Sequence, residues 1–147
     1  MEKESTRKTS ARNSFFGKVR TIRQEDIQTR VELLTMGGLT ITTIITNDSA
    51  KRLGLKVGQL LTAEVKAPWV MLHKGIEAKE CSADNMFSGT VERITEGCIN
   101  TEYIVQISDG TQVCSMTTSE SCRRLGLKVG DRAWVLFNGY SVVLLSE

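Results

Sequence analysis

Five residues of this chain have side chains that could together hold a small anion. Arg12 and Lys66 carry positive charges, Ser10 lies two positions before Arg12, and Thr46 and Ser49 lie at the predicted start of a helix. A helix N-terminus presents free backbone N–H groups, and nearby hydroxyls add further donors. A cation about 4 Å from a dianion contributes on the order of 8 kcal/mol at an effective dielectric of 20, before desolvation is subtracted. These residue types predict an oxyanion site, provided that Arg12 and Lys66 meet in the fold.

The same residues also admit a purely structural interpretation. Arg12 and Lys66 are the kind of charged residue that is usually solvated at the surface. Ser10 could belong to a polar tail, and Ser49 could simply cap a helix. Asp48 could satisfy the helix dipole without any ligand. Spacing alone leaves the two interpretations open.

A repeat with a fixed offset of 72 residues organises the chain. Residues 10–17 return in altered form at 82–89, and residues 52–58 return unchanged at 124–130. We therefore expect a polar tail at 1–9, a first unit at 10–72, a linker at 73–81 and a second unit at 82–147.

The two copies differ most at two of the charged positions. Asp84 stands where the first copy has Arg12, and Asn138 stands where it has Lys66. The change amounts to three charge units, so an anion site is expected in the first unit only. Residues 1–81 have 14 basic and 9 acidic residues, and residues 82–147 have 5 and 8, which agrees with this asymmetry.

Each unit carries the signals of five short strands and one short helix. Residues 36–38 and 108–110 have the composition of hairpin turns. Polar residues open a helix at 46–54, and Gly54 ends it. In the first unit the strands are predicted at residues 16–22 (with a bend at Gly17), 29–35, 39–46, 59–66 and 69–72. The fold class is therefore all-β, with two tandem five-stranded barrels similar to the oligonucleotide-binding (OB) barrel.

Few residues could support catalysis or hold a metal cation. His73 is the only histidine and lies in the expected linker, so the usual nucleophile–base arrangement is disfavoured. The four cysteines lack C-x-x-C spacing, which argues against a zinc site. No apolar stretch approaches a membrane span, and residues 1–10 are too polar for a signal peptide, so we expect a cytoplasmic protein. Because few residues could support catalysis, we expect that it is not an enzyme.

Four segments closely resemble the molybdate-binding Mop family, also called molbindins. They are Ser10–Asn13, Ile45–Ser49, Arg52–Leu55 and Lys66–Val70, and the resemblance covers residues 10–145 of both copies. It implies a duplicated, di-Mop arrangement that binds molybdate or tungstate, without catalysis and without an organic cofactor. The ligand residues implied by the family are Ser10, Arg12, Thr46, Ser49, Lys66 and the backbone N–H of Ala67.

The resemblance also implies how the chain assembles. In the family the site lies between subunits, with Ser10 and Arg12 of one chain meeting Thr46, Ser49 and Lys66 of the other. Asp84 and Asn138 are typical of the degenerate second copy in the sensing domain of the molybdate-responsive transcription regulator. We therefore expect an effector-sensing module that forms a homodimer, with a trimer as the alternative, and no DNA-binding domain in this chain.

Three alternative functions are kept open. A stand-alone molbindin would store oxyanion and normally keeps the Ser-Ala-Arg-Asn motif in both copies. An accessory domain of a transporter ATPase shares the barrel motif. A barrel that binds single-stranded nucleic acid needs exposed aromatics over basic residues. The chain has eight aromatics, and five of them lie in strand patterns that predict core packing: Phe15, Phe16, Phe87, Phe137 and Tyr140.

Overall fold

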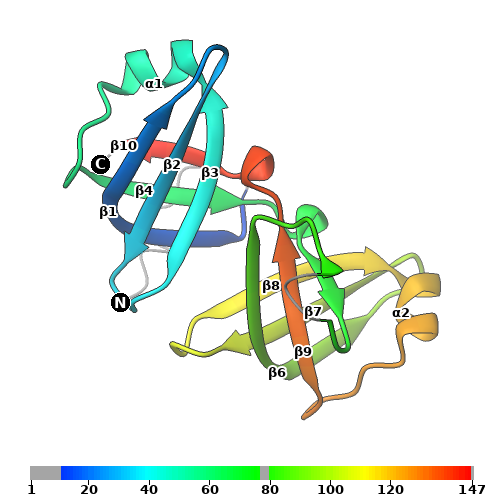
Figure 1. Cartoon of the computed structure of the whole chain (residues 1–147). Coiled ribbons are helices and arrows are strands. Elements are labelled where there is room, and N and C mark those ends of the chain that lie inside the picture. The colour runs from blue at the N-terminus through cyan, green and yellow to red at the C-terminus, as the bar shows by residue number, and fades with distance from the viewer. Residues whose placement is uncertain (1–10, 77–79, 147) are drawn as a thin grey trace.

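The computed structural model describes residues 11–76 and 80–146 of the chain. In these residues ten strands form two curled, antiparallel five-stranded sheets, each accompanied by one short α-helix (Figure 1). The first repeat contains β1 (Asn13–Gln24), β2 (Gln28–Thr35), β3 (Thr40–Thr46), α1 (Asn47–Leu53), β4 (Leu60–Val65), the 3-10 turn η2 (Ala67–Trp69) and β5 (Met71–His73). The second repeats this order as β6 (Asn85–Glu96), β7 (Asn100–Ile107), β8 (Gln112–Thr118), α2 (Ser119–Leu125), β9 (Arg132–Phe137), η4 (Gly139–Ser141) and β10 (Val143–Ser146). The described part of the chain contains no helix long and apolar enough to span a membrane.

The two repeats exchange their last strands. The first sheet has the order β10-β4-β1-β2-β3, and the second has the order β5-β9-β6-β7-β8. In Figure 1 the red strand β10 lies beside β4 of the upper barrel, and the strand that follows η2 lies in the lower one. The folded barrels therefore do not coincide with the sequence units 10–72 and 82–147. The sequence does not predict this exchange, because β5 and β10 are copies of one another and either would fit either barrel.

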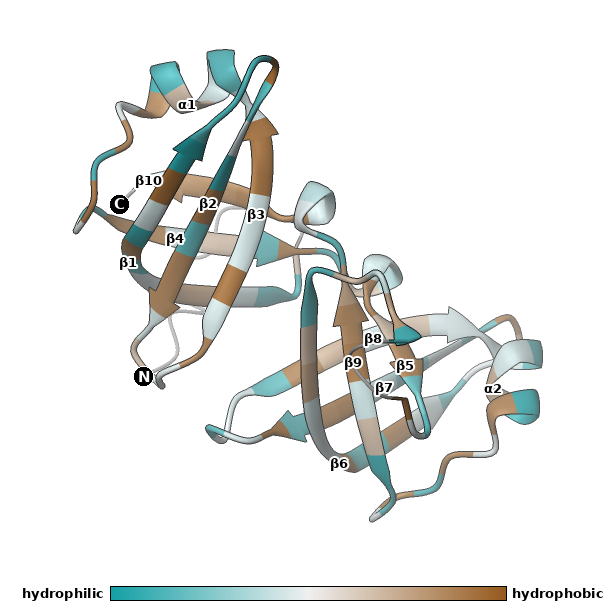
Figure 2. Cartoon of the chain, viewed as in Figure 1, coloured by the Kyte–Doolittle hydropathy of each residue, from teal (hydrophilic) through white to brown (hydrophobic). Residues whose placement is uncertain are grey.

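Alternation of apolar and polar residues explains the barrel cores. In β2 every second residue is buried, including Val31 and Leu33, and these face buried residues of β1 and β4 such as Val19 and Leu61. Figure 2 shows the hydrophobic positions distributed along the strands of both barrels. The alternation leaves one face of each sheet apolar, and curling the sheet buries that face within its own barrel.

A glycine in the first strand of each repeat permits the sheet to curl tightly. An added Cβ at Gly17 would lie 2.3 Å from the carbonyl oxygen of Leu34, and one at Gly89 would lie 2.4 Å from that of Gln106. Both first strands have a register shift a few residues later. Gly17 thus lies where the neighbouring strand approaches closely, and β1 is longer than the predicted strand at 16–22.

The predicted turns and helix are also present. Gly38 and Gly110 end the hairpin turns with φ of 89° and 90°, a left-handed conformation that glycine adopts without strain. Thr46 caps α1 at its N-terminus, and Gly54 ends it with φ of 61°. Each helix therefore begins where the third strand of its repeat ends.

Two buried asparagines join the barrels. The side chain of Asn13 accepts from the backbone N–H of Cys114 at 2.7 Å and donates to its carbonyl at 2.8 Å. Asn85, 72 positions later, does the same with Thr42 at 2.8 and 2.9 Å. Each asparagine begins the first strand of one repeat and bonds to the third strand of the other. The two repeats are thus held together by matching contacts on the two sides of the junction.

Candidate functional site

The sheet register brings Arg12 and Lys66 to the same end of two neighbouring strands. Asn13 of β1 pairs with Val65 of β4 in an antiparallel ladder. Arg12 precedes Asn13 and Lys66 follows Val65, so the two cations occupy the next position of that ladder. No ion pair involving Lys66 is found within residues 11–76 and 80–146. An anion site requires that these two residues meet in the fold, and the register of β1 and β4 is consistent with that requirement.

Arg12 is bound by a carboxylate of the other barrel. Its Nη1 pairs with Oε2 of Glu102 on β7, and its Nη2 donates to Oε1 at 3.1 Å. The Arg12 side chain is 46% exposed and that of Glu102 is 24% exposed, so solvent partly screens the pair. The hydrogen bond from Arg12 lowers the pKa of Glu102, with further lowering by the charges of Arg12 and Arg93, while partial burial opposes the shift. The sequence does not predict Glu102 as a partner of Arg12, since no periodicity links positions 90 residues apart.

Thr46 and Ser49 form a second polar group at the start of α1. Oγ1 of Thr46 donates to Oγ of Ser49 at 2.9 Å and accepts from the Ser49 backbone N–H at 3.1 Å. Arg52 donates to the Ser49 hydroxyl at 3.1 Å, which brings a further cation to this group. The sequence marked Arg52 as part of the repeat and of the Mop resemblance, but did not predict this contact with Ser49. The three residues line an open groove with Tyr140 and Val142 of the second repeat.

The two groups do not form one site within a single chain. Thr46 pairs with Gln28, which follows the far end of β1, whereas Arg12 precedes the first residue of β1. Figure 1 shows α1 at the outer end of the upper barrel, away from the junction between the barrels. Arg12 and Lys66 instead lie at the junction, because η2 packs against β8 and Arg12 pairs with β7. Ser10, the remaining predicted side chain, lies outside the described residues.

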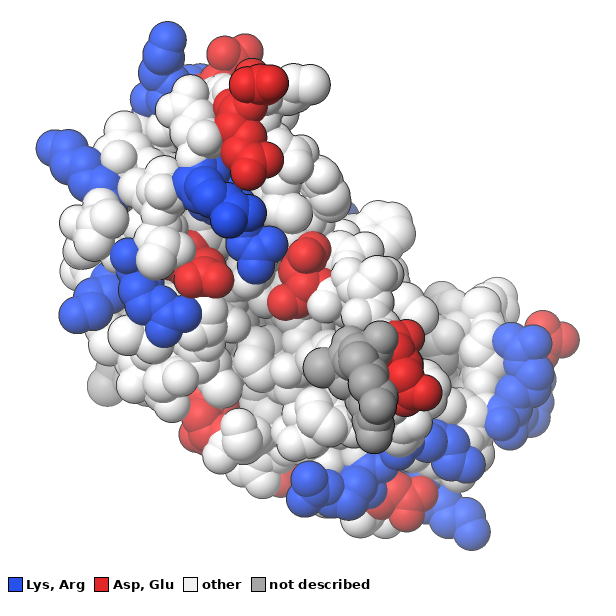
Figure 3. Space-filling view, viewed as in Figure 1, with Lys and Arg blue, Asp and Glu red and all other residues white. Residues whose placement is uncertain are grey.

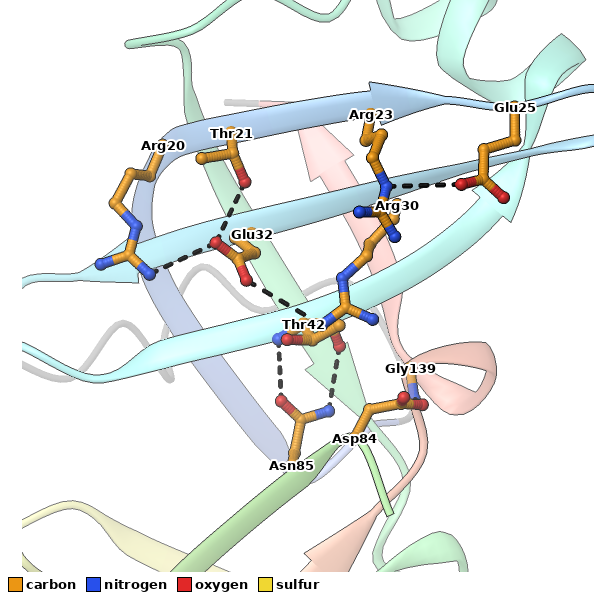
Figure 4. Close-up of polar contacts among 10 residues, drawn as sticks. All are labelled: Arg20, Thr21, Arg23, Glu25, Arg30, Glu32, Thr42, Asp84, Asn85 and Gly139. Atoms are coloured by element: carbon orange, nitrogen blue, oxygen red, sulfur yellow. Dashed lines mark hydrogen bonds and ion pairs between the residues drawn. The ribbon is translucent and has the colours of Figure 1, made fainter. Parts of the chain in front are cut away.

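In the second repeat, Asp84 and Asn138 stand at the positions that match Arg12 and Lys66. Asp84 and Asn138 again flank a paired end, here that of Asn85 with Phe137. Oδ2 of Asp84 accepts from the backbone N–H of Gly139 at 2.8 Å (Figure 4). Gly139 is the counterpart of Ala67, which begins η2 directly after Lys66. In the second repeat, a carboxylate oxygen therefore accepts from the backbone N–H that corresponds to the Ala67 N–H of the first repeat.

Ala67 is held in place by the residues that pack around it. It is 1% exposed and packs with Ile104 and Cys114 of the second barrel. Pro68 follows it and fixes the backbone at the start of η2. The Ala67 N–H is thereby placed next to Lys66 at the end of β4.

Two segments of the chain match a known family. The sequence model of the TOBE domain family covers residues 9–72 and 81–144, which correspond to the two repeats. The chain belongs to the TOBE domain family. It contains two TOBE repeats in tandem, and their fifth strands are exchanged between the barrels.

The TOBE pair is similar to bacterial proteins of molybdenum metabolism. It is 37% identical over 137 residues to the transcriptional regulator ModE of Yersinia pestis, covering 92% of this chain and 52% of that protein. It is 34% identical over 139 residues to the molybdenum-pterin-binding protein MopA of Rhodobacter capsulatus, covering 95% and 52%. The chain thus spans about half the length of these relatives.

A solved structure matches the TOBE pair over nearly its whole length. It is a crystal structure of the cytoplasmic molybdate-binding protein ModG with molybdate bound, at a TM-score of 0.90 and 35% identity. The match covers 96% of this chain and 100% of that chain. The predicted membership of the Mop group and the predicted di-Mop fold of two five-stranded barrels are both confirmed.

His73 and Cys114 are two potentially reactive side chains of the TOBE pair whose surroundings the structure describes. Nδ1 of His73 accepts from the backbone N–H of Gly75 at 3.0 Å. All four cysteines are unpaired, and burial raises the pKa of the Cys114 thiol, which disfavours a reactive thiolate. Within the described ranges no group of three or more His, Cys, Asp or Glu residues could hold a metal ion.

The surface gives little support to a nucleic-acid interface. On the face in Figure 3, basic side chains lie in separate groups with acidic side chains among them. Phe15 and Phe137 are buried and stack with ring centroids 6.1 Å apart. The prediction of core packing was wrong for Tyr140, which lies in η4, is 67% exposed and donates to Gln28 at 2.9 Å. A second exposed ring, Trp69, is 58% exposed and lies in the other 3-10 turn, η2. Two exposed rings on separate turns are few for a stacking platform.

Proposed function

We propose that this TOBE pair binds one molybdate or tungstate dianion per chain and performs no catalysis. Arg12 and Lys66 supply the positive charges, the Ala67 N–H supplies a backbone donor, and Ser10 adds a hydroxyl. Thr46 and Ser49 come from a second copy of the chain. The oxyanion is a ligand bound through its oxygens, and no organic cofactor takes part.

The observation that supports this proposal most directly is the hydrogen bond from the Gly139 N–H to the carboxylate of Asp84. Asp84 Oδ2 lies 2.8 Å from that nitrogen, so this backbone position is already a site for an anionic oxygen in one repeat. In the other repeat the matching N–H of Ala67 is accompanied by two cations in place of a carboxylate and an amide. The complex of ModG with molybdate supports the choice of ligand.

The proposed site lies between two copies because each copy holds its parts at opposite ends of β1. The cationic group and the hydroxyl group cannot close on one small ion within one barrel. A dianion that contacts two chains binds one relative arrangement of those chains best, and this couples ligand binding to the geometry of a dimer. We therefore favour a homodimer over a trimer.

Among the possible cellular roles we favour that of an effector-sensing module. Asp84 and Asn138 leave one binding position per chain, whereas a storage protein would gain from two. A stand-alone role in intracellular molybdate storage is the alternative, and ModG is described as a cytoplasmic protein. We propose a cytoplasmic location for either role.

Isothermal titration with molybdate tests the proposal. We expect about one ion per chain for the wild type, and a loss of affinity of roughly tenfold or more for Lys66→Ala, since a charge-assisted contact is removed. Asn138→Ala is the matched control, because it changes the same position of the second repeat and should leave the affinity unchanged. Sulfate provides a comparison with a smaller oxyanion of equal charge. Two equal sites per chain would favour storage, and absence of binding would refute the proposal.

A mixing experiment tests whether the site is shared. Lys66→Ala and Ser49→Ala chains are each expected to bind weakly. In a mixed dimer one site combines the intact Lys66 of one chain with the intact Ser49 of the other, and the other site carries both defects. Mixing should therefore restore about one strong site per mixed dimer. Unchanged weak binding after subunit exchange would place both residues in one chain.

A further inference from the structure

The Arg12–Glu102 ion pair connects the two barrels, and in it Glu102 binds the guanidinium that the proposed ligand also needs. Arg12 stands before the first strand of one barrel, and Glu102 lies on β7 of the other. The carboxylate engages both Nη atoms of the guanidinium. An oxyanion is best recognised by the same planar fork of donors. Glu102 and a bound oxyanion therefore require the same face of one side chain.

We propose that Glu102 is an internal competitor of the oxyanion for Arg12, and that ligand binding releases the Arg12–Glu102 contact between the barrels. This inference rests on the proposed function. Two effects oppose the ligand while Glu102 remains in place. The ion pair must be broken or shared, and the carboxylate then lies close to a dianion of the same sign.

The fold does not depend on this ion pair to hold its barrels together. The second half of the junction has reversed charges, with Asp84 at the position of Arg12 and Arg30 at that of Glu102. There, Asp84 bonds to the Gly139 N–H, and Arg30 lies 3.9 Å from Glu32 on its own strand. The contacts common to both halves include the buried asparagine bonds and the bonds that the Thr43 and Ser115 hydroxyls donate to the carbonyls of Val142 and Val70. Glu102 can thus release Arg12 while the junction stays closed.

The surroundings of Glu102 also make its release feasible. Arg93, on the neighbouring strand β6, acts electrostatically on the carboxylate in addition to Arg12. When Arg12 turns to the ligand, Glu102 keeps the favourable field of Arg93 and solvent access through its 24% exposed side chain. Glu64, a carboxylate on β4, accepts from the Ser14 hydroxyl at 2.7 Å.

Glu102→Gln tests the competition, because it removes the charge and keeps the shape. Isothermal titration with molybdate should show binding about three- to tenfold tighter than in the wild type. Glu96→Gln is the control, since Glu96 pairs with Arg123 at 3.6 Å on the same barrel and the net charge changes equally. Its affinity should stay within about twofold of the wild type. Equal or weaker binding by Glu102→Gln would overturn the proposal.

Arginine side-chain NMR tests the release directly. The Arg12 Nε signal should differ between the free wild type and free Glu102→Gln, and the molybdate-bound spectra of the two should coincide. Different bound spectra would show that Glu102 still holds Arg12, and would overturn the release. If the wild type binds no molybdate, the proposed function itself fails. If the wild type binds and Glu102→Gln gains nothing, only the competition fails.

Discussion

Substituting two residues of the second repeat should create a second oxyanion site. The perturbation is Asp84→Arg combined with Asn138→Lys, which copies Arg12 and Lys66 onto the matching ladder position. The rest of the proposed site is already present in that repeat. Thr118 donates to Ser121 at 3.0 Å, accepts from its N–H at 3.1 Å, and Arg124 donates to Ser121 at 2.9 Å. The backbone N–H of Gly139 becomes available once Asp84 is gone.

The size of the effect follows from the charges. A unit charge about 4 Å from a dianion contributes about 2 kcal/mol in bulk water and about 8 kcal/mol at an effective dielectric of 20. The two substitutions change the local charge by three units. Even the bulk-water value gives about 6 kcal/mol, which corresponds to roughly four orders of magnitude in affinity. Such a difference separates a repeat that is silent at millimolar ligand from one that binds in the micromolar range or below.

Molybdenum content after equilibrium dialysis, together with titration calorimetry, measures the outcome. The double variant should bind about two ions per chain, and adding Lys66→Ala should weaken the first site and leave the new one. Circular dichroism checks that the variant is folded, since losing the Asp84–Gly139 bond costs about 1–3 kcal/mol. A folded double variant that still binds one ion would refute the reasoning. It would show that the charges at these two positions do not decide which repeat binds.

Three further predictions concern the fold and the junction. Gly17→Ala should lower the free energy of unfolding by about 2 kcal/mol or more in urea titrations, because its Cβ would meet the Leu34 carbonyl at 2.3 Å, whereas Gly75→Ala has open space and serves as the control. Asn13→Ala should cost about 2–4 kcal/mol by the same assay, since it leaves two buried backbone groups of Cys114 without partners. Arg12 holds the pKa of Glu102 below its unfolded value near 4.5, so their pair stabilises the fold above that pH and loses its effect as the pH falls through the lowered pKa. The wild type should thus exceed Glu102→Gln in stability by up to about 1 kcal/mol at pH 7, and equal stability losses for both between pH 7 and pH 3 would contradict this.

Much of the local structure could be predicted because it depends on short stretches of sequence. The turn at Gly38 needs a left-handed residue, the helix start needs a hydroxyl at Thr46, and Gly17 marks the place where a neighbouring strand approaches closely. Each of these signals lies within a few residues of the feature that it determines. The offset between the repeats then transferred every local prediction from the first copy to the second.

The exchange of strands could not be predicted in the same way. β5 and β10 are short, apolar and related by the repeat, so hydrophobic pattern alone fits both to both barrels. What distinguishes the partners is the path of the chain through η2 and η4 and the buried asparagine contacts, which link positions 101 and 43 residues apart. The same limit concealed Glu102 as the partner of Arg12. Contacts between the repeats depend on how the barrels pack against each other, and sequence periodicity carries no information about that packing.

Comparison of the two repeats separates the groups that maintain the fold from those that select a ligand. The hydroxyl network at the start of α1 has distances of 2.9, 3.1 and 3.1 Å, and its copy at α2 has 3.0, 3.1 and 2.9 Å. The copy keeps this geometry in a repeat that lacks both cations, so these hydroxyls are maintained as helix caps whether or not an anion is bound. Under the proposed function, we therefore expect ligand selectivity between the repeats to come from positions 12 and 66 and their counterparts. In the second repeat a carboxylate of the chain itself already accepts from the backbone donor at 2.8 Å.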